Sequence, residues 1–235
     1  MIHDLQKNIK KNLAFIEENM LEYSMRQNLS LDDVILVLVS KYYSCEHIAI
    51  ANGFGKIDFG ESRVQELISK QETLDLDLNW HFIGHLQTNK VKYVLDNLHL
   101  LHSLDKLKLA KEINRQCIAK GTTMDVLLQV NISKEDTKFG IYQDDIYEFV
   151  DEISTLNHVK VKGLMTMAPY TDNASEISKT FSGLRKLFDE FANQDLPANI
   201  EMKHISMGMS NDYKIALQEG SNMLRIGSGI FGKKE

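Results

Sequence analysis

Residues 34–41 have the sequence Val-Ile-Leu-Val-Leu-Val-Ser-Lys, an apolar run that ends abruptly in two polar residues. Aliphatic and β-branched residues without polar alternation are typical of a strand that is covered on both faces. Such strands occur in parallel sheets, whose crossover helices cover both sides. We therefore expect a buried parallel strand over 34–39, with Ser40 and Lys41 at its carboxyl end.

Seven more short apolar segments follow this strand, and helical patterns separate them. Strict alternation of strand and helix predicts parallel pairing with right-handed crossovers. Eight such units in about 200 residues fit a (β/α)8 TIM barrel of the α/β class, and a doubly wound open sheet is the alternative. The expected strands are 34–39, 57–60, 80–84, 98–102, 124–132, 159–165, 202–206 and 223–226, and the expected helices are 63–73, 90–95, 104–119, 143–154, 175–193, 211–219 and one from Ser44 onward.

An additional helix precedes the first strand. Apolar residues recur at Ile2, Leu5, Ile9, Leu13 and Ile16 with charged residues between them, which is the spacing of one helix face. We expect this amphipathic helix, residues 1–27, to pack on the barrel. No Pro/Gly-rich linker divides the sequence, so residues 1–235 are expected to form a single domain.

Composition excludes several classes of protein. With 235 residues, 43% of them hydrophobic, the chain is too apolar for a disordered one. Its longest apolar run is far shorter than the roughly 20 residues of a membrane helix. A formal net charge of −6 argues against a general nucleic-acid binder. The two cysteines form no disulfide framework and the first residues form no signal peptide, so we expect a cytoplasmic protein.

A phosphate site is expected at the loops that follow the last two strands. In barrels of this kind these loops, with the N-terminus of a short extra helix, commonly bind phosphate. Ser206 ends one strand and Gly227-Ser228 follows the other. Glycine lets the backbone approach phosphate oxygens, and N–H groups and a hydroxyl donate to them. The alternative is that both loops are ordinary tight turns, which also favour Gly and Ser.

Lys41 is the candidate reactive group. Its stem would lie among apolar side chains at the barrel mouth, where desolvation disfavours the ammonium form and makes the amine nucleophilic enough for a Schiff base. The alternative is a lysine that extends from the strand end into water. A reactive lysine that faces a phosphate site fits a phosphorylated aldehyde cofactor, and pyridoxal 5′-phosphate (PLP) is the obvious one.

Arg225 belongs to the last strand, beside the expected phosphate loop. A guanidinium is always charged and can only donate hydrogen bonds. If it faces the pyridine nitrogen of PLP, it keeps that nitrogen unprotonated, and the ring withdraws electrons poorly. The alternative is a structural ion pair with a carboxylate of the barrel. Glu61 is the one carboxylate that we expect at the barrel mouth, and His81 and His102 are expected to be structural.

The sequence resembles the PLP homeostasis protein family, single-domain relatives of the N-terminal barrel of alanine racemase. The matching motifs occur in family order along nearly the whole chain. They are Val39-Ser40-Lys41, FGESRVQE at 59–66, WHFIGHLQTNK at 80–90, Gly163-Leu164-Met165, SMGMS at 206–210 and RIGSGIFG at 225–232.

The resemblance implies a barrel that holds PLP as a Schiff base on Lys41. It also implies phosphate contacts from Ser206, Gly227 and Ser228, and a place for Arg225 near the pyridine nitrogen. Met165, Met207 and Ser62 would line the pocket. The family often has Asn at the position of Ser62, which puts a direct contact to the ring hydroxyl side in doubt. It often has Thr at the position of Ser228, and that change keeps the hydroxyl.

The resemblance further implies a binder that buffers or delivers PLP, with PLP-dependent apoenzymes as acceptors. We expect a monomer, because no large apolar surface stripe is evident beyond the helix faces, and the charge and short apolar runs predict neither a nucleic acid nor a membrane as partner. Two classes of enzyme are the alternatives, one that uses PLP and one that does not. A PLP-dependent amino-acid racemase needs a base on each face of Cα, and only the lysine face is evident in a chain that ends soon after Gly232. A PLP-free aldolase or sugar-phosphate isomerase would need a paired acid/base carboxylate.

Overall fold

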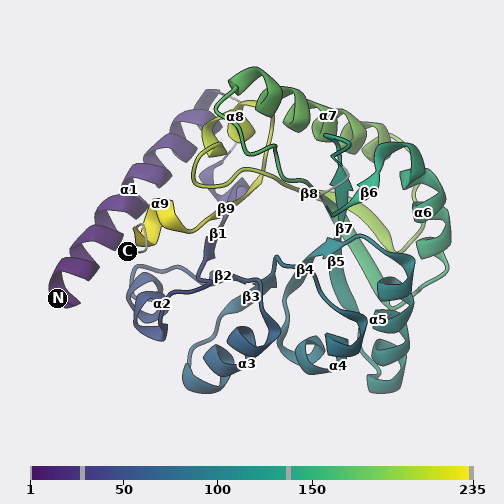
Figure 1. Cartoon of the computed structure of the whole chain (residues 1–235), viewed down its shortest axis with the longest axis horizontal. Helices are drawn as coiled ribbons and strands as arrows, with labels where there is room; N and C mark the ends of the chain where they lie inside the picture. The colour runs from purple at the N-terminus through teal and green to yellow at the C-terminus, as the bar shows by residue number, and fades with distance from the viewer. Residues whose placement is uncertain (1, 27–29, 136–138, 233–235) are drawn as a thin grey trace.

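The computed structural model describes residues 2–26, 30–135 and 139–232, and it is a closed parallel barrel surrounded by helices (Figure 1). The sheet order is β4-β3-β2-β1-β9-β8-β7-β5, and a β4–β5 pairing closes the ring. This closure confirms the barrel and excludes the open sheet. The eight barrel strands are β1 (Ile35–Val39), β2 (Asp58–Glu61), β3 (Asn79–Phe82), β4 (Leu100–Leu104), β5 (Met124–Asn131), β7 (Val159–Met165), β8 (Ile200–Ser206) and β9 (Met223–Ile226).

The helices occupy the outside of the barrel, largely where the sequence predicts them. The region predicted as one helix over 90–95 is instead a short α-helix flanked by two 3-10 turns. No helix in the described part of the chain is long and apolar enough to cross a membrane. The α-helices are α1 (Ile2–Arg26), α2 (Cys45–Asn52), α3 (Val64–Thr73), α4 (Val91–Val94), α5 (Leu107–Lys120), α6 (Ile146–Ser154), α7 (Ala174–Ala192), α8 (Tyr213–Gln218) and α9 (Ser228–Phe231).

Helix α1 confirms the amphipathic pattern over the residues that the structure describes; Met1 and Gln27 of the predicted range lie outside them. Its buried residues include Ile9, Leu13 and Ile16, each at most 3% exposed. The helix packs against α9, α2 and α8, on the side of the barrel where β1 and β9 meet (Figure 1). The first and last helices are thus brought together beside the first strand.

One element was not predicted. Strand β6 (Ile141–Tyr142) pairs in parallel with the end of β5, with Val130 opposite Ile141. It follows a polar loop and has only two residues, which is too short for a recognisable alternation of side chains. Strand β4 also begins two residues later than predicted, because Leu98 and His99 belong to the approach to the barrel.

The inside of the barrel is divided between apolar and polar side chains. Val37, Leu100, Leu127, Met165 and Met223 form a separate buried cluster from the one between the barrel and its helices. Because side chains alternate along a strand, Arg225 shares the inward face of Met223, and His102 shares that of Leu100. A polar group in such a closed interior needs a hydrogen-bond partner there.

A side chain added at Gly163 would test how closely the neighbouring strands of the barrel wall pack. Its φ is +138°, and a Cβ built there would overlap the His204 carbonyl oxygen of the neighbouring strand. We expect Gly163→Ala to lower the free energy of unfolding by about 3 kcal/mol, which at this size lowers Tm by roughly 6–12 °C. Thermal unfolding followed by circular dichroism measures this.

Gly55→Ala is the matched control, because φ is also positive there (+80°) but nothing lies within 4 Å of the added Cβ. This variant carries only the backbone preference, about 1 kcal/mol. Equal losses of stability in the two variants would contradict the steric argument for Gly163.

Candidate functional site

Lys41 lies in a turn directly after β1, at the carboxyl end of the barrel. It is half-buried, and within the described parts of the chain no hydrogen bond or ion pair engages its amine. The next residue, Tyr42, has a φ of +69°, a conformation that few side chains other than glycine adopt. The turn is therefore held in place by something other than local backbone preference.

A buried ionic cluster holds that turn on both sides of Lys41. Lys70 of α3 donates from Nζ to the Ser40 carbonyl oxygen at 2.8 Å, to Glu61 Oε1 at 2.6 Å and to Glu66 Oε1 at 2.8 Å. Ser40 Oγ donates to Glu61 Oε1 at 2.6 Å. The backbone N–H of Tyr42 donates to Glu66 Oε1 at 2.6 Å. Residues 40 and 42 are both fixed, so the position of Lys41 between them is fixed as well.

The cluster corrects the expected place of Glu61. This side chain is fully buried between the barrel and α3, where it pairs with Lys70, and so it does not offer an acid/base carboxylate in the mouth. Burial raises the pKa of Glu61, against the hydrogen bonds from Lys70 and Ser40, which lower it. Partial burial also raises the pKa of Glu66, but hydrogen bonds from Lys70 and the Tyr42 N–H lower this pKa overall.

The loop after β9 lies against the end of β1. A Cβ built on Gly227 would lie 3.0 Å from the Val39 carbonyl oxygen, which is closer than side chains normally come. Gly229 N–H donates to Ser210 Oγ at 3.1 Å and so joins this loop to the loop after β8. Ser228 is exposed at the start of α9. The structure thus brings Gly227 and Ser228 close to the strand end that carries Lys41.

Arg225 is 3% exposed and points into the barrel from β9. Its Nη1 donates to Ser206 Oγ at 2.6 Å and its Nη2 to the Thr166 carbonyl oxygen at 2.9 Å. Burial lowers its pKa to about 10, and the charge of Asp212 opposes this. Both acceptors are neutral, so among the described residues Arg225 forms no direct ion pair with a barrel carboxylate.

The other predicted site residues lie at different depths. The Ser206 hydroxyl is fully buried between Arg225 and His102, and its Oγ lies 3.1 Å from His102 Nδ1. Met165 belongs to the apolar cluster inside the barrel, whereas Met207 is buried in the cluster between barrel and helices. Ser62 is half-buried just after β2. The structure gathers Arg225, Ser206 and Met165 in the interior and places Lys41, Ser62, Gly227 and Ser228 at the strand ends.

Sequence reasoning missed three polar groups near this site. Lys70 was not singled out within its predicted helix, and His81 and His102 were interpreted only as structural. His81 alternates with the apolar Trp80 and Phe82, which is the one signal in the sequence that it faces inward. His81 Nδ1 lies 2.9 Å from His102 Nε2 inside the barrel.

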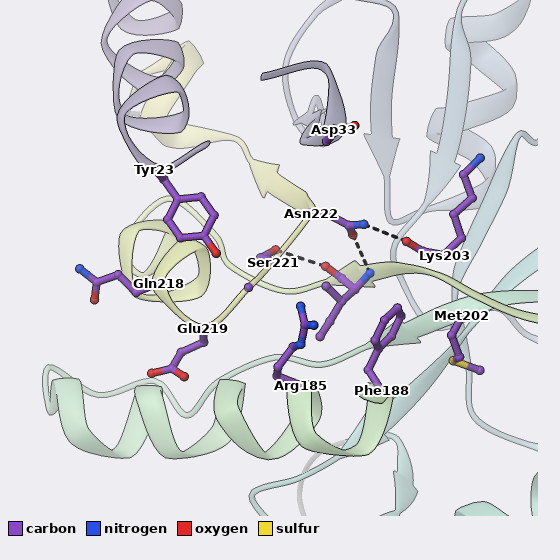
Figure 2. Close-up of a pocket in the computed structure, with 12 residues that line it drawn as sticks. Tyr23, Asp33, Arg185, Phe188, Met202, Lys203, Gln218, Glu219, Ser221 and Asn222 are labelled. Atoms are coloured by element: carbon purple, nitrogen blue, oxygen red, sulfur yellow. Dashed lines mark hydrogen bonds between the residues drawn. The ribbon is translucent and has the colours of Figure 1, made fainter. Parts of the chain in front are cut away.

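A hollow of about 620 Å³ lies at the opposite end, between α1, α7 and the start of β9. Figure 2 shows Tyr23 and Arg185 facing it from the two helices. Two of its polar side chains have partners: Arg185 pairs with Asp189, and Asn222 donates to the Lys203 carbonyl oxygen at 2.8 Å. The hollow contains none of the predicted site residues.

Comparison with known proteins agrees with this arrangement. A family model described as "Alanine racemase, N-terminal domain" matches residues 12–235. The pyridoxal phosphate homeostasis protein of Aquifex aeolicus is 41% identical over 199 residues, which cover 84% of this chain and 82% of that protein. The chain belongs to the pyridoxal phosphate homeostasis protein family.

Solved structures include two informative neighbours. PipY of Synechococcus elongatus, solved with PLP bound, has a TM-score of 0.81 and 32% identity, and the match covers 95% of this chain and all of that one. Alanine racemase of Corynebacterium glutamicum has a TM-score of 0.75 at 12% identity, over 97% of this chain and 62% of the racemase. The second likeness shows the shared fold alone.

The buried pairing of Lys70 with Glu61 predicts how the loss of one charge changes the stability of the protein. Lys70→Met would leave Glu61 charged and buried without its cation, and breaking such a pair lowers stability by about 3–5 kcal/mol. Removing both charges in Lys70→Met/Glu61→Leu should recover most of that loss. Urea unfolding of the single and double variants measures it.

Lys162→Met is the matched control, because its ion pair with Glu201 lies at the surface. Loss of that pair should change stability by at most about 1 kcal/mol. A Lys70→Met protein as stable as Lys162→Met would contradict the role given to the buried cluster.

Buried histidines predict how stability depends on pH. Desolvation lowers the pKa of His81, lowers that of His102 well below its usual value, and lowers that of His204 to about 4. The unfolded chain therefore binds more protons than the folded one below about pH 6.5. Stability should fall as pH decreases from 6.5, by about 1.4 kcal/mol per pH unit for each such histidine.

Urea unfolding between pH 7 and pH 5 measures this slope. His204→Gln should reduce it by about one histidine's share. A stability that stays constant, or rises, toward pH 5 would contradict the neutral state of these buried rings.

Proposed function

We propose that this protein binds PLP at the carboxyl end of the barrel, attached to Lys41 as a Schiff base, and serves PLP homeostasis without a turnover reaction of its own. The observation that carries the proposal is the position of Lys41. Its amine has no partner among the described residues, its turn is held on both sides by the cluster around Lys70, and the Gly227 loop packs against its strand.

The residues present fit this cofactor. The Lys41 amine supplies the nucleophile for an aldehyde, and the backbone of Gly227 and Ser228 supplies N–H donors where no side chain blocks a phosphate. Of the five guanidinium N–H groups of Arg225, two have protein acceptors, so donors remain for a ring nitrogen. Bound PLP supplies an electrophilic aldehyde and an electron-accepting ring.

Each residue has a distinct task in this proposal. Lys41 condenses with the aldehyde and releases water. Arg225 donates to the ring nitrogen and keeps it unprotonated, which weakens the ring as an electron acceptor. Met165 and Ser62 border the ring, and Met207 supports the wall behind it. Ser206, whose hydroxyl was expected to contact the phosphate, is shared between Arg225 and His102 and acts on the cofactor through Arg225.

The structure counts against the PLP-free enzyme in one respect. Glu61, the expected acid/base carboxylate of the mouth, pairs through Oε1 with Lys70 and Ser40. The proposal also includes release of PLP to apoenzymes, in a monomeric cytoplasmic protein. PipY, which is related in sequence over nearly its whole length, has been solved with PLP bound, and this supports the cofactor assignment.

Titration with PLP tests the proposal. The wild type should take up one equivalent with a new near-ultraviolet or visible band, and borohydride should fix the cofactor on the peptide that contains Lys41. Lys41→Ala should show no fixed cofactor, and Lys111→Ala, a change at an exposed lysine, should behave like the wild type.

Two results would contradict the proposal. A wild type that takes up no PLP would exclude the cofactor. Sustained interconversion of L- and D-alanine by the loaded protein would contradict the absence of turnover and favour the racemase.

A further inference from the structure

A continuous chain of hydrogen bonds crosses the inside of the barrel, from Asp58 at the start of β2 to Arg225 on β9. Asp58 Oδ1 lies 3.0 Å from His81 Nε2, and His81 Nδ1 lies 2.9 Å from His102 Nε2. His102 Nδ1 lies 3.1 Å from Ser206 Oγ, which accepts from Arg225 Nη1 at 2.6 Å. Neither histidine is more than 1% exposed, so water does not replace these bonds.

The Asp58 end of this hydrogen-bond chain determines the direction of the bonds between neutral rings. Ionised Asp58 only accepts, so His81 carries its proton on Nε2 and donates to it. The bare His81 Nδ1 then accepts from His102 Nε2–H, and the bare His102 Nδ1 accepts the Ser206 O–H. Ser206 Oγ also accepts from Arg225, which only donates. Both rings are thus neutral Nε2–H tautomers.

Reversal of this direction is unfavourable at the Asp58 end. If His102 carried its proton on Nδ1, its bare Nε2 would require an N–H from His81 Nδ1. The neutral His81 would then turn a bare Nε2 toward the Asp58 carboxylate at 3.0 Å, so two acceptors would face each other. Asn79 Nδ2 also donates to Asp58 Oδ1, at 3.1 Å, and this favours the ionised carboxylate.

The surroundings also favour neutral rings at His81 and His102 and an ionised carboxylate at Asp58. Burial disfavours a second proton on the His102 ring, and the charge of Arg225 acts in the same direction. Burial of Asp58 raises its pKa, but hydrogen bonds from His81 and Asn79 lower it overall. The titratable and charged groups that act on the two histidines are Asp58, His99, His204 and Arg225, and Asp212 acts on Arg225.

We propose that His81 and His102 are positioning residues for Arg225, and that as neutral Nε2–H tautomers they orient the Ser206 hydroxyl so that the guanidinium is aimed at the pyridine nitrogen of PLP. The role toward the ring rests on the proposed function, whereas the direction of the hydrogen-bond chain does not. Asp58 is the remote anionic end of this chain, and Arg225 keeps its full charge because its direct acceptors are neutral.

Ring ¹⁵N NMR of the cofactor-free protein tests the direction of the hydrogen-bond chain. At pH 7.5 both rings should show an unprotonated Nδ1 and a protonated Nε2, with the signals assigned by His81→Gln and His102→Gln. Asp58→Leu removes the terminal acceptor and should change the tautomer population of His81. An Nδ1–H tautomer, or an imidazolium, at either ring in the wild type would overturn the proposal.

The absorption band and dissociation constant of bound PLP test the positioning role. His102→Leu leaves the Ser206 O–H without an acceptor and should shift the band and weaken PLP binding by about tenfold, the effect of one hydrogen bond to a charged network. His102→Asn keeps an acceptor near the place of Nδ1 and should recover most of the affinity. His99→Gln is the control: this exposed ring lies with its centroid 5.4 Å from that of His81, without a hydrogen bond to it, and affinity should be unchanged.

The outcomes separate the two proposals. If wild type and His102→Leu bind PLP equally and with the same band, the positioning role is overturned even where the tautomers are as expected. If the wild type takes up no PLP, the proposed function and the role toward the ring both fail, while the cofactor-free ¹⁵N spectrum still decides the direction of the hydrogen-bond chain. If His102→Leu does not fold, His102→Asn and Asp58→Leu carry the comparison.

Discussion

Pairing of β4 with β5 closes the sheet into a ring, and the rest of the site depends on this closure. A closed ring has an inside from which water is largely excluded, so every polar group there must find a protein partner. Arg225, Ser206, His102 and His81 satisfy one another across the barrel because the strands that carry them meet around one axis. In an open sheet these strands would lie far apart.

Two polar systems flank the barrel wall at the site. Inside, the hydrogen-bond chain from Asp58 ends on the guanidinium of Arg225. Outside, the cluster around Lys70 forms hydrogen bonds with the backbone on either side of Lys41. Since alternate residues of a strand face opposite ways, the same strands serve both systems: Asp58 faces inward from β2 and Glu61 faces α3. Each system fixes one of the two groups proposed to hold the cofactor.

The barrel and the place of Lys41 were predictable because both depend on local patterns: an apolar run, alternation of strand and helix, and the polar residue at a strand end. The pairing of Lys70 with Glu61 was not, because nothing in a helical pattern shows that a lysine faces inward. The contact of His81 with His102 depends on strand register and barrel closure. Strand β6 is too short to leave a pattern at all.

The arrangement around Arg225 bears on why a PLP protein of this kind would bind rather than catalyse. A guanidinium paired directly with a carboxylate would be neutralised and held by that carboxylate. Here its acceptors are the Ser206 hydroxyl and the Thr166 carbonyl, and Asp212 acts on it through its charge, without a hydrogen bond between the two among the described residues. The positive charge therefore remains at the position proposed for the ring nitrogen and disfavours its protonation. An unprotonated ring accepts electrons poorly, so the interior that we propose holds PLP would also restrain its chemistry.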